Sequence, residues 1–535
     1  MKKLKHVAIL IALVLIYISN NRGYGQMPVS SSTVYNIKDF NAVGDGKTLD
    51  SKAINQAIKA AAKDGGGTVY FPPGTYLSAS IRLMSNITLY LEAGSVIEAV
   101  NDSIGKYDPP EPNPQTGYYQ DYGHSHWQNS LIWGIGLDNV SILGPGLIFG
   151  KGLNSGFNRF ADVENGEQRY KDGGPGSGNK AISLKNCNNV ILRDFSLLHG
   201  GHFGILATGV DNLTIDNLKI DTNRDGMDID ACKNVRITNC SVNSPWDDGI
   251  CLKASYGLNE IRHCENITIS DCFLSGNFIE GTLIDGTFQS PSPEYKSYYT
   301  GRIKLGTESN GDFKNITITN CIFDQSRGIA IESVDGSHIE DIAISNITMR
   351  EVDNSPIFIR LGGRLRGPNN PPVGTIKRIS IDNMVISNAA PGSTKATTIS
   401  GIPGHYVEDI RISNIYIHYE GGGSNDDNDL VPADNEEGYP EPGMFGALPA
   451  YGFYIRHAKA IEMNHVKLDY TGEELRNAFV LKDVEDAYFD HMNIKKGTGS
   501  KAAFFDLREV SNFNIEDSRT IQNLKTKEFI GREKL

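Results

Sequence analysis

The feature that most constrains the fold is a short unit that recurs along most of the sequence. Each copy has a small polar pair followed by aliphatic or β-branched residues that alternate with polar ones. Such period-2 alternation is typical of strands that bury one face. Neighbouring copies start about 22 to 32 residues apart, and longer gaps hold insertions. Copies begin at Asp138, Asn189, Asp211, Lys233, Glu265, Lys314, Glu340, Lys377 and Glu408, and weaker ones at Lys459, Glu485 and Ser511.

This spacing selects among the all-β architectures. Turns of a β-sandwich fall about every 8 to 12 residues, and propeller blades repeat at about 40 to 45. The repeat seen here matches neither, and almost no helical pattern separates its copies. We therefore expect an all-β fold, a right-handed parallel β-helix, in which each coil packs only on its neighbours.

The ends and interruptions of the repeat divide the chain. Residues 34–100 read as an N-terminal cap and the first coils, with a helix at 53–62 that Asp50 and Ser51 can cap. Residues 101–525 read as the β-helix catalytic domain. Insertions at 101–136, 275–300, 363–375 and 418–450 break the period. The aromatic residues of the first insertion either stack on sugar rings or cover the apolar flank of the coil; they include Tyr118, Tyr119, His124, His126 and Trp127.

Charge and cysteine content restrict the partners. Residues 1–25 resemble a secretory signal, with three lysines before an apolar stretch, so we expect export to the periplasm or outside the cell, and no membrane contact after cleavage. The net charge of −13 argues against nucleic acid. The seven cysteines follow the repeat rather than a zinc-binding spacing, which predicts buried thiols, with one or two disulfides as the alternative. We expect a monomer with no cofactor and no bound metal.

Three aspartates stand out because of the distance between them. Asp225 and Asp247 are 22 residues apart, which is also the local repeat length, and Asp248 follows directly. Residues one repeat apart in a β-solenoid stack about 4.8 Å from each other. Carboxylates held that close raise the pKa of one member, so that one holds a proton while its neighbours stay ionised. This arrangement suits cleavage of a glycosidic bond.

At this point the chain resembles glycoside hydrolase family 28, the polygalacturonase family. The resemblance rests on Gly-Asp-Gly at 44–46, Phe-Pro-Pro-Gly at 71–74, Asn-Arg-Asp at 223–225 and Asp-Asp at 247–248. It implies hydrolysis of pectic polysaccharide with inversion, with Asp247 as general acid and with Asp225 and Asp248 holding and activating the water. An inverting site is expected to separate acid from base by roughly 6.5 to 9.5 Å.

Two motifs of the family do not match. A Gly-His-Gly element would fall near residues 300–302, where the histidine is absent, and an Arg-x-Lys pair would fall on Ala330 and Glu332. Arg302 and Lys304 form such a pair one coil earlier, and we expect them to bind the substrate carboxylate; the alternative is a solvated strand edge. Further candidates for substrate binding are Asn223, His202, Lys253 and Arg360.

The predicted function is therefore a secreted, inverting hydrolase of α-galacturonosidic bonds, whose partner is a pectic poly- or oligosaccharide. The long insertions favour exo-type release from a chain end. Rhamnogalacturonan and branched pectin are alternative substrates. A calcium-dependent lyase, with Asp228 as an additional calcium ligand, and a non-catalytic carbohydrate-binding β-helix are alternatives of other classes.

Overall fold

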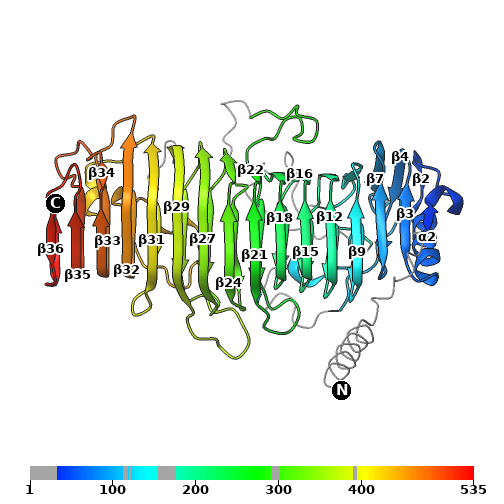
Figure 1. Ribbon diagram of the computed structural model, residues 1–535, viewed down its shortest axis with the longest axis horizontal. Coiled ribbons are helices and arrows are strands. Elements are labelled where there is room, and N and C mark those ends of the chain that lie inside the picture. The colour runs from blue at the N-terminus through cyan, green and yellow to red at the C-terminus, as the bar shows by residue number, and fades with distance from the viewer. Residues whose placement is uncertain (1–32, 113–118, 120–121, 155–175, 291–299, 390–394) are drawn as a thin grey trace, which may run out of the picture.

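The computed structural model describes residues 33–112, 119, 122–154, 176–290, 300–389 and 395–535. They form the expected right-handed parallel β-helix, with all strands from β1 to β35 paired in parallel and in sequence along one long axis (Figure 1). The proposed signal at 1–25 lies outside these residues. Among the described residues, no helix combines the length and apolar character that a membrane span requires.

Each coil of the first half contributes one strand to each of three sheets. We call the first the front sheet. It consists of β5 (Ile81–Arg82), β8 (Ile132–Ile135), β11 (Lys180–Lys185), β14 (Phe203–Thr208), β17 (Asp225–Asp230), β20 (Ile250–Ala254), β23 (Ile303–Ser309), β26 (Ile329–Ser333), β28 (Ile357–Leu361) and β30 (Thr397–Ser400).

The second and third sheets complete each coil, and their apolar residues alternate into one continuous core. The second holds β6 (Ile87–Leu91), β9 (Asp138–Leu143), β12 (Asn188–Arg193), β15 (Asp211–Asp216), β18 (Lys233–Thr238), β21 (Cys264–Ser270) and β24 (Phe313–Thr319). The third holds β7 (Ser95–Ala99), β10 (Leu147–Phe149), β13 (Ser196–Leu198), β16 (Lys219–Asp221), β19 (Ser241–Asn243), β22 (Phe273–Ser275) and β25 (Ile322–Asp324).

In the second half, longer strands run around the corners of the coil. They are β27 (His338–Arg350), β29 (Thr375–Ala389), β31 (Val407–Tyr419), β32 (Ala450–Tyr470), β33 (Asn477–Asp490) with β34 (Asn493–Ile494), and β35 (Phe505–Glu516). At the corners, asparagines adopt the left-handed conformation and hydrogen-bond from coil to coil, as in Asn315 Nδ2 to Asn266 Oδ1 at 2.7 Å. These corner asparagines are thus part of the repeat.

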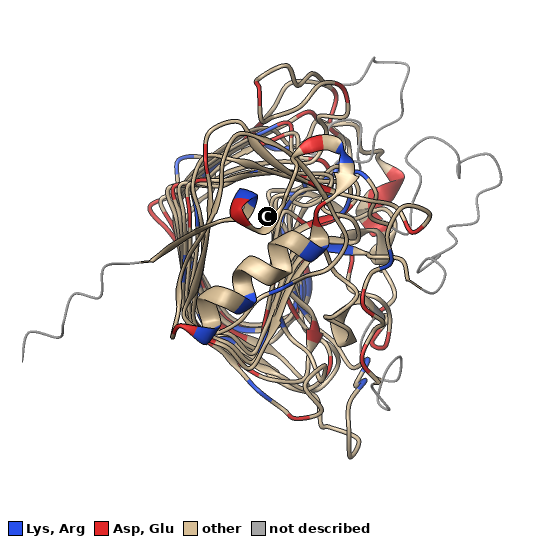
Figure 2. Ribbon diagram, turned by 90° about the vertical axis from the view of Figure 1, so that its right-hand side faces the viewer, with Lys and Arg blue, Asp and Glu red and all other residues tan. Residues whose placement is uncertain are grey.

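Both ends of the coil are covered. At the N-terminal end lie β1 (Val34–Asn36), η1 (Ile37–Phe40), β2 (Asp45–Leu49), α2 (Ser51–Lys63), β3 (Gly67–Phe71) and β4 (Gly74–Ser78), and α2 crosses the open end (Figure 2). The helix is longer than predicted. Asp50 makes no cap; its carboxylate accepts from Val43 N and Gly44 N instead. At the C-terminal end, β36 (Leu524–Thr526) and β37 (Ile530–Lys534) pair antiparallel with β35.

The predicted insertions are loops before β8, β23, β29 and β32, and the longest loops gather on one side of the coil (Figure 2). Two of them contain short 3₁₀ turns: the first holds η2 (Tyr122–Ser125), and the last holds η3 (Asp426–Asp429) and η4 (Pro442–Phe445). A further long connection at 150–179, between β10 and β11, was not among the predicted insertions. All seven cysteines are buried free thiols, so the disulfide alternative is wrong for this structure.

Candidate active site

The three aspartates meet on the front sheet. Asp225 opens β17, and Asp247 and Asp248 lie in the turn before β20, the strand that pairs with β17. One carboxylate oxygen of each lies within 4.8 Å of one from the other two. The repeat therefore brings them together as expected. Their nearest oxygens are closer than the 6.5 Å or more expected between two carboxylates of an inverting site.

Close approach of the two coils fixes this geometry. The backbone N–H of Asp248 donates to Asp225 Oδ1 at 3.3 Å and to Asp247 Oδ1 at 3.1 Å. A Cβ on Gly226 would lie 2.4 Å from the carbonyl oxygen of Gly249, so a side chain at this position would force the coils apart. The glycine after Asp225 is thus needed to bring its carboxylate against the next turn.

Asp248 is buried and held by two cations. Arg302 Nε donates to its Oδ1 at 2.6 Å, and Lys304 Nζ donates to its Oδ2 at 2.9 Å. Burial alone would raise the pKa of Asp248, but the two cations outweigh it and hold the pKa well below its usual range. Asp248 is therefore ionised at neutral pH.

Asp225 has the opposite electrostatics. Its burial, together with the charges of Asp228 and Asp247, raises its pKa well above the ordinary value. Asp228 is fully buried, neither of its oxygens accepts a hydrogen bond, and burial raises its pKa to about 8, although Lys253 lowers it. The site thus combines one firmly ionised carboxylate with carboxyl groups that retain a proton at neutral pH.

Asp247 is the most open of the three, with 30% of its side chain exposed. Arg224 Nη2 donates to its Oδ2 at 2.7 Å, and Arg224 Nη1 lies 3.1 Å from His202 Nε2. Burial and the Arg224 charge lower the pKa of His202 well below its ordinary value, so the ring is neutral. Sequence reasoning did not select Arg224; the only signal was its place between Asn223 and Asp225 in the Asn-Arg-Asp motif.

The other predicted residues lie at different depths. Asn223 is half-buried, and its Oδ1 is 3.2 Å from His199 Nδ1. His202 is buried beneath Arg224, and Lys253 is buried with its ammonium 3.0 Å from Glu308 Oε2. The structure therefore places Asn223 at the margin of the site and the other two behind its surface.

Arg360 requires a correction. It is fully buried, and its guanidinium donates to the carbonyl oxygens of Asp434 at 2.8 Å and Asn435 at 3.1 Å. Arg456 binds the preceding carbonyls, those of Pro432 and Ala433. Arg360 thus anchors the 418–450 insertion and does not face a substrate. Charge within a strand correctly indicated an outward-facing contact, but the contact is made with the protein's own loop.

Apolar clusters lie on the front sheet on both sides of the site. On the N-terminal side, Trp127 is fully buried against Phe203 and Leu206, and Leu206 pairs in register with Asp228. Trp127 thus covers the coil flank, the second of the two roles considered. On the C-terminal side, Phe445 packs with Ala330, Phe358, Leu448 and Tyr454. The four ladder steps from Leu206 to Ala330 span roughly 19 Å.

Two insertions also reach the site itself. Glu441, from the last insertion, accepts from Arg302 Nη2 at 2.5 Å. The insertion before β23 is fixed to the ends of β16 and β19, where Leu283 N donates to Asp221 Oδ2 at 2.8 Å and Phe278 N donates to Asn243 Oδ1. In Figure 1 this loop rises above β16 and β22. Both β16 and β19 lead directly into the catalytic turns.

Glu332 occupies the position where the Arg-x-Lys lysine was expected. It is fully buried, and neither of its carboxyl oxygens has a hydrogen-bond partner. Burial raises its pKa to about 8, although Lys304 and Arg302 oppose the shift. The expected cation is therefore replaced by a carboxyl group that is mostly neutral at pH 7.

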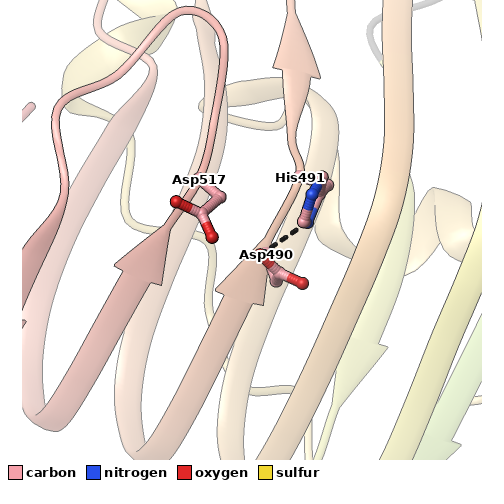
Figure 3. Close-up of side chains that lie close together, drawn as sticks. All are labelled: Asp490, His491 and Asp517. Atoms are coloured by element: carbon pink, nitrogen blue, oxygen red, sulfur yellow. Dashed lines mark ion pairs between the residues drawn. The ribbon is translucent and has the colours of Figure 1, made fainter.

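A second carboxylate cluster lies near the C-terminal end of the coil. Asp490, His491 and Asp517 place one ligand atom each within 4.8 Å of one another, and His491 Nδ1 pairs with Asp490 Oδ1 at 2.7 Å (Figure 3). His491 and Asp517 are exposed. These residues are in the turns after β33 and β35 and are not part of the site on β17 and β20.

Comparison with known proteins agrees with this geometry. Residues 34–250 match a family model described as rhamnogalacturonase A/epimerase, pectate lyase-like. A probable polygalacturonase of Vitis vinifera is 26% identical over 394 residues, which are 71% of this chain and 73% of that protein. An endo-polygalacturonase of Pectobacterium carotovorum is 23% identical over 341 residues, 61% of this chain and 73% of that one.

Solved structures establish the fold independently. An exopolygalacturonase of Thermotoga maritima superposes with a TM-score of 0.61 at 18% identity, over 82% of this chain and 92% of that one. A family 28 exopolygalacturonase of Yersinia enterocolitica superposes with a TM-score of 0.56 at 17% identity, over 87% and 78% of the two chains. At such identities the likeness concerns the β-helix itself.

Proposed function

We propose that this chain is a member of glycoside hydrolase family 28 that hydrolyses α-galacturonosidic bonds of pectic polysaccharide from a chain end; the match of residues 34–250 to the family model and the similarity to polygalacturonases support this. The observation that carries the proposal is the group of three carboxylates in which Asp248 is held ionised by Arg302 and Lys304 while Asp225 retains a proton. Export after removal of residues 1–25 and a monomeric state are part of the same proposal.

The three carboxylates take different roles in the proposed reaction. Asp248, ionised and buried, is the base that removes a proton from the attacking water. Asp225 keeps its proton because its pKa is raised, so it cannot act as the base and holds that water by a hydrogen bond. Asp247, the most exposed of the three, donates the proton to the leaving glycosidic oxygen. Arg224 orients Asp247, and the neutral His202 supports Arg224 from behind.

Inversion is proposed because of the family, since the spacing of the carboxylates alone does not select it. The reaction attaches the water oxygen to the anomeric carbon as the bond to the leaving sugar breaks. Proton NMR of the first product formed from an oligogalacturonide would show the β-anomer before mutarotation. Early appearance of the α-anomer would instead mean retention, and a product with ultraviolet absorbance would indicate a lyase.

Attack at a chain end is supported by the two apolar clusters. Trp127 and its partners close the front sheet on one side of the aspartates, and Phe445 and its partners close it on the other. A polymer cannot lie along a face that is blocked at both ends, so a terminal unit must enter. Time-resolved sizing of products should show one short product from the start; an early ladder of intermediate oligomers with a rapid fall in viscosity would contradict it.

A second substrate, rhamnogalacturonan or a branched pectin, is favoured by one observation. Glu332 stands where a cation would bind a uronate, and its buried carboxyl group is mostly neutral at pH 7 and has no hydrogen-bond partner. Arg302 and Lys304 are engaged with Asp248 and Glu441. Assays on homogalacturonan, rhamnogalacturonan and branched pectic oligosaccharides, with product analysis, would separate the substrates.

A further inference from the structure

We propose that the N-terminal cap carries a second carbohydrate-binding site, one that holds an acidic oligosaccharide by its carboxylates away from the aspartates. The inference rests on the proposed function, because it takes its ligand class from a pectic substrate. Its basis is a hollow of about 430 Å³ between α2, β5 and the segment that follows β7. It is lined by Leu49, Ser51, Lys52, Asn55, Gln56, Lys59, Ala79, Ser80, Arg82 and Lys106.

The charge of this hollow is unusual for the chain. Four of its ten lining residues are cationic and none is acidic, although the chain as a whole carries −13. Arg82 is neutralised by Asp108, at 2.7 and 2.5 Å. Lys52, Lys59 and Lys106 are exposed and form no ion pair among the residues that the structure describes. The hollow therefore presents three uncompensated positive charges.

The helix arranges these charges toward one side. Lys52, Gln56 and Lys59 follow the i, i+4, i+7 spacing that places side chains along one face of a helix. No acidic residue of the lining offsets these charges. An anion bound in the hollow would gain Coulomb attraction without having to displace an internal counter-ion, which is the physical reason to expect one.

The spread of the charges selects the kind of anion. Seven residues of helix separate Lys52 from Lys59, about 10 Å along the axis. One small anion such as sulfate cannot contact both ammonium groups and Lys106 at once. A ligand with carboxylates repeated along a chain can, and the exposed amide of Gln56 between the two lysines can bond its hydroxyls. An oligomer of uronic acids fits this description.

The hollow lies on the same face as the aspartates but outside their site. Arg82 pairs in register with Trp133, and the ladder continues through Ser183 and Leu206 to Asp228. These four steps place Arg82 roughly 19 Å from Asp228. The cluster around Trp127 covers Leu206 between them. A polymer segment held at the cap would thus raise the local concentration of chain ends beside the catalytic site.

The test is calorimetric titration of the full chain carrying Asp247→Asn, which binds without cleaving, with a galacturonate hexamer at low salt. We expect two sites per chain. Adding Lys52→Glu and Lys59→Glu should leave one, or weaken the second at least tenfold. The matched control, Lys525→Glu with Lys527→Glu, makes the same charge change at the far end of the chain and should retain both sites.

Three results would overturn the inference. They are a single site in the Asp247→Asn chain, two sites that survive the Lys52→Glu and Lys59→Glu changes, and competition by equimolar sulfate as strong as that by the hexamer. Thermal unfolding confirms that each variant is folded. Failure of the proposed function is read separately, from hydrolysis of pectic substrates by the wild type: without hydrolysis, two sites that respond to the lysine changes would still support the cap.

Discussion

The catalytic strands and the C-terminal strands of the front sheet place charged side chains on the same outward face, yet use them differently. Around β17, β20 and β23, Asp225, Asp228 and Asp248 crowd together, and Asp228 has no hydrogen-bond partner. In β28, β32 and β35, Arg360, Arg456 and Arg508 each donate to backbone carbonyls of residues 428–435. In the first region the ionised carboxylates are bound by side chains, Asp248 by Arg302 and Lys304 and Asp247 by Arg224; in the second the arginines are bound by the backbone of a loop.

The difference teaches what an outward charge in a solenoid strand means. Arg360, Ser400 and Arg456 occupy one register row, whereas the row of Asp228 continues to Phe358, two positions before Arg360. Positions two apart in a strand share a face, so outward orientation does not separate the two groups. What separates them is the covering segment: carbonyl oxygens of an extended loop match guanidinium donors, whereas no segment supplies donors to Asp228. The candidate catalytic carboxylates are held by side chains of the site and not by the backbone of a covering loop.

The largest expected effect, a loss of kcat, comes from removing a carboxylate of the first region. Asp247→Asn or Asp248→Asn should lower kcat by about 10²- to 10⁴-fold, since each removes a proton-transfer group. Initial rates on an oligogalacturonide measure the loss, and thermal unfolding confirms the fold. Asp409→Asn makes the same chemical change at an exposed corner position of β31 and should retain full activity. Near-normal turnover in either catalytic variant would remove the three-carboxylate assignment.

The next largest effect should come from removing an arginine that binds the 418–450 insertion. Arg456→Met leaves the carbonyls of Pro432 and Ala433 without a donor and should destabilise the fold by about 3 kcal/mol. As the 418–450 insertion loosens, products should become more varied in length. Denaturant titration and product sizing measure both effects. Arg378→Met, which loses exposed pairs with Glu340 and Asp341, is the control and should barely move the midpoint.

A smaller effect should follow from removing one of the two cations that face Asp248. Arg302→Met removes a charge that lowers the pKa of Asp248, so that pKa rises. Because Asp248 must be ionised to act as the base, activity is lost as pH falls through its pKa. The acidic limb of the kcat/KM profile should therefore move up by about one to three pH units. Arg327→Met, which removes a cation beside Glu441 and not beside Asp248, should leave the limb in place.

The smallest effect concerns stability and pH. The pKa of Glu332 is raised to about 8, so the folded state holds its proton more tightly than the unfolded state. This contribution to stability is complete below the ordinary glutamate pKa and is lost as pH rises through about 8. Glu332→Gln should reduce the fall in Tm between pH 5 and pH 9 by roughly 2 °C. Glu408→Gln, on an exposed position of β31, should leave it as in the wild type.

Sequence reasoning reached the fold and the three aspartates because both depend on local repetition. A repeat of 22 to 23 residues places Asp225 beside the Asp247–Asp248 pair whatever the loops do, and the register aligns Asp225 with Asp248. It did not reach Arg224 as the partner of Asp247, Glu441 as the partner of Arg302, or the loop carbonyls bound by Arg360. The latter two join residues 74 to 139 positions apart through insertions without a period of their own. The spacing of these residues in the sequence does not indicate which strand such a loop will contact.

The segments that cover the ends of the coil prevent further strands from pairing there. A parallel coil offers the same row of N–H and C=O groups at its last turn as at every earlier one, so an open end is a template for another chain. Here β36 and β37 reverse direction against β35 and carry Arg532, Glu533 and Lys534 on exposed positions. The reversal and the charge end the ladder. A chain cut after β35 would retain its catalytic coils and be prone to edge-to-edge polymerisation into fibres.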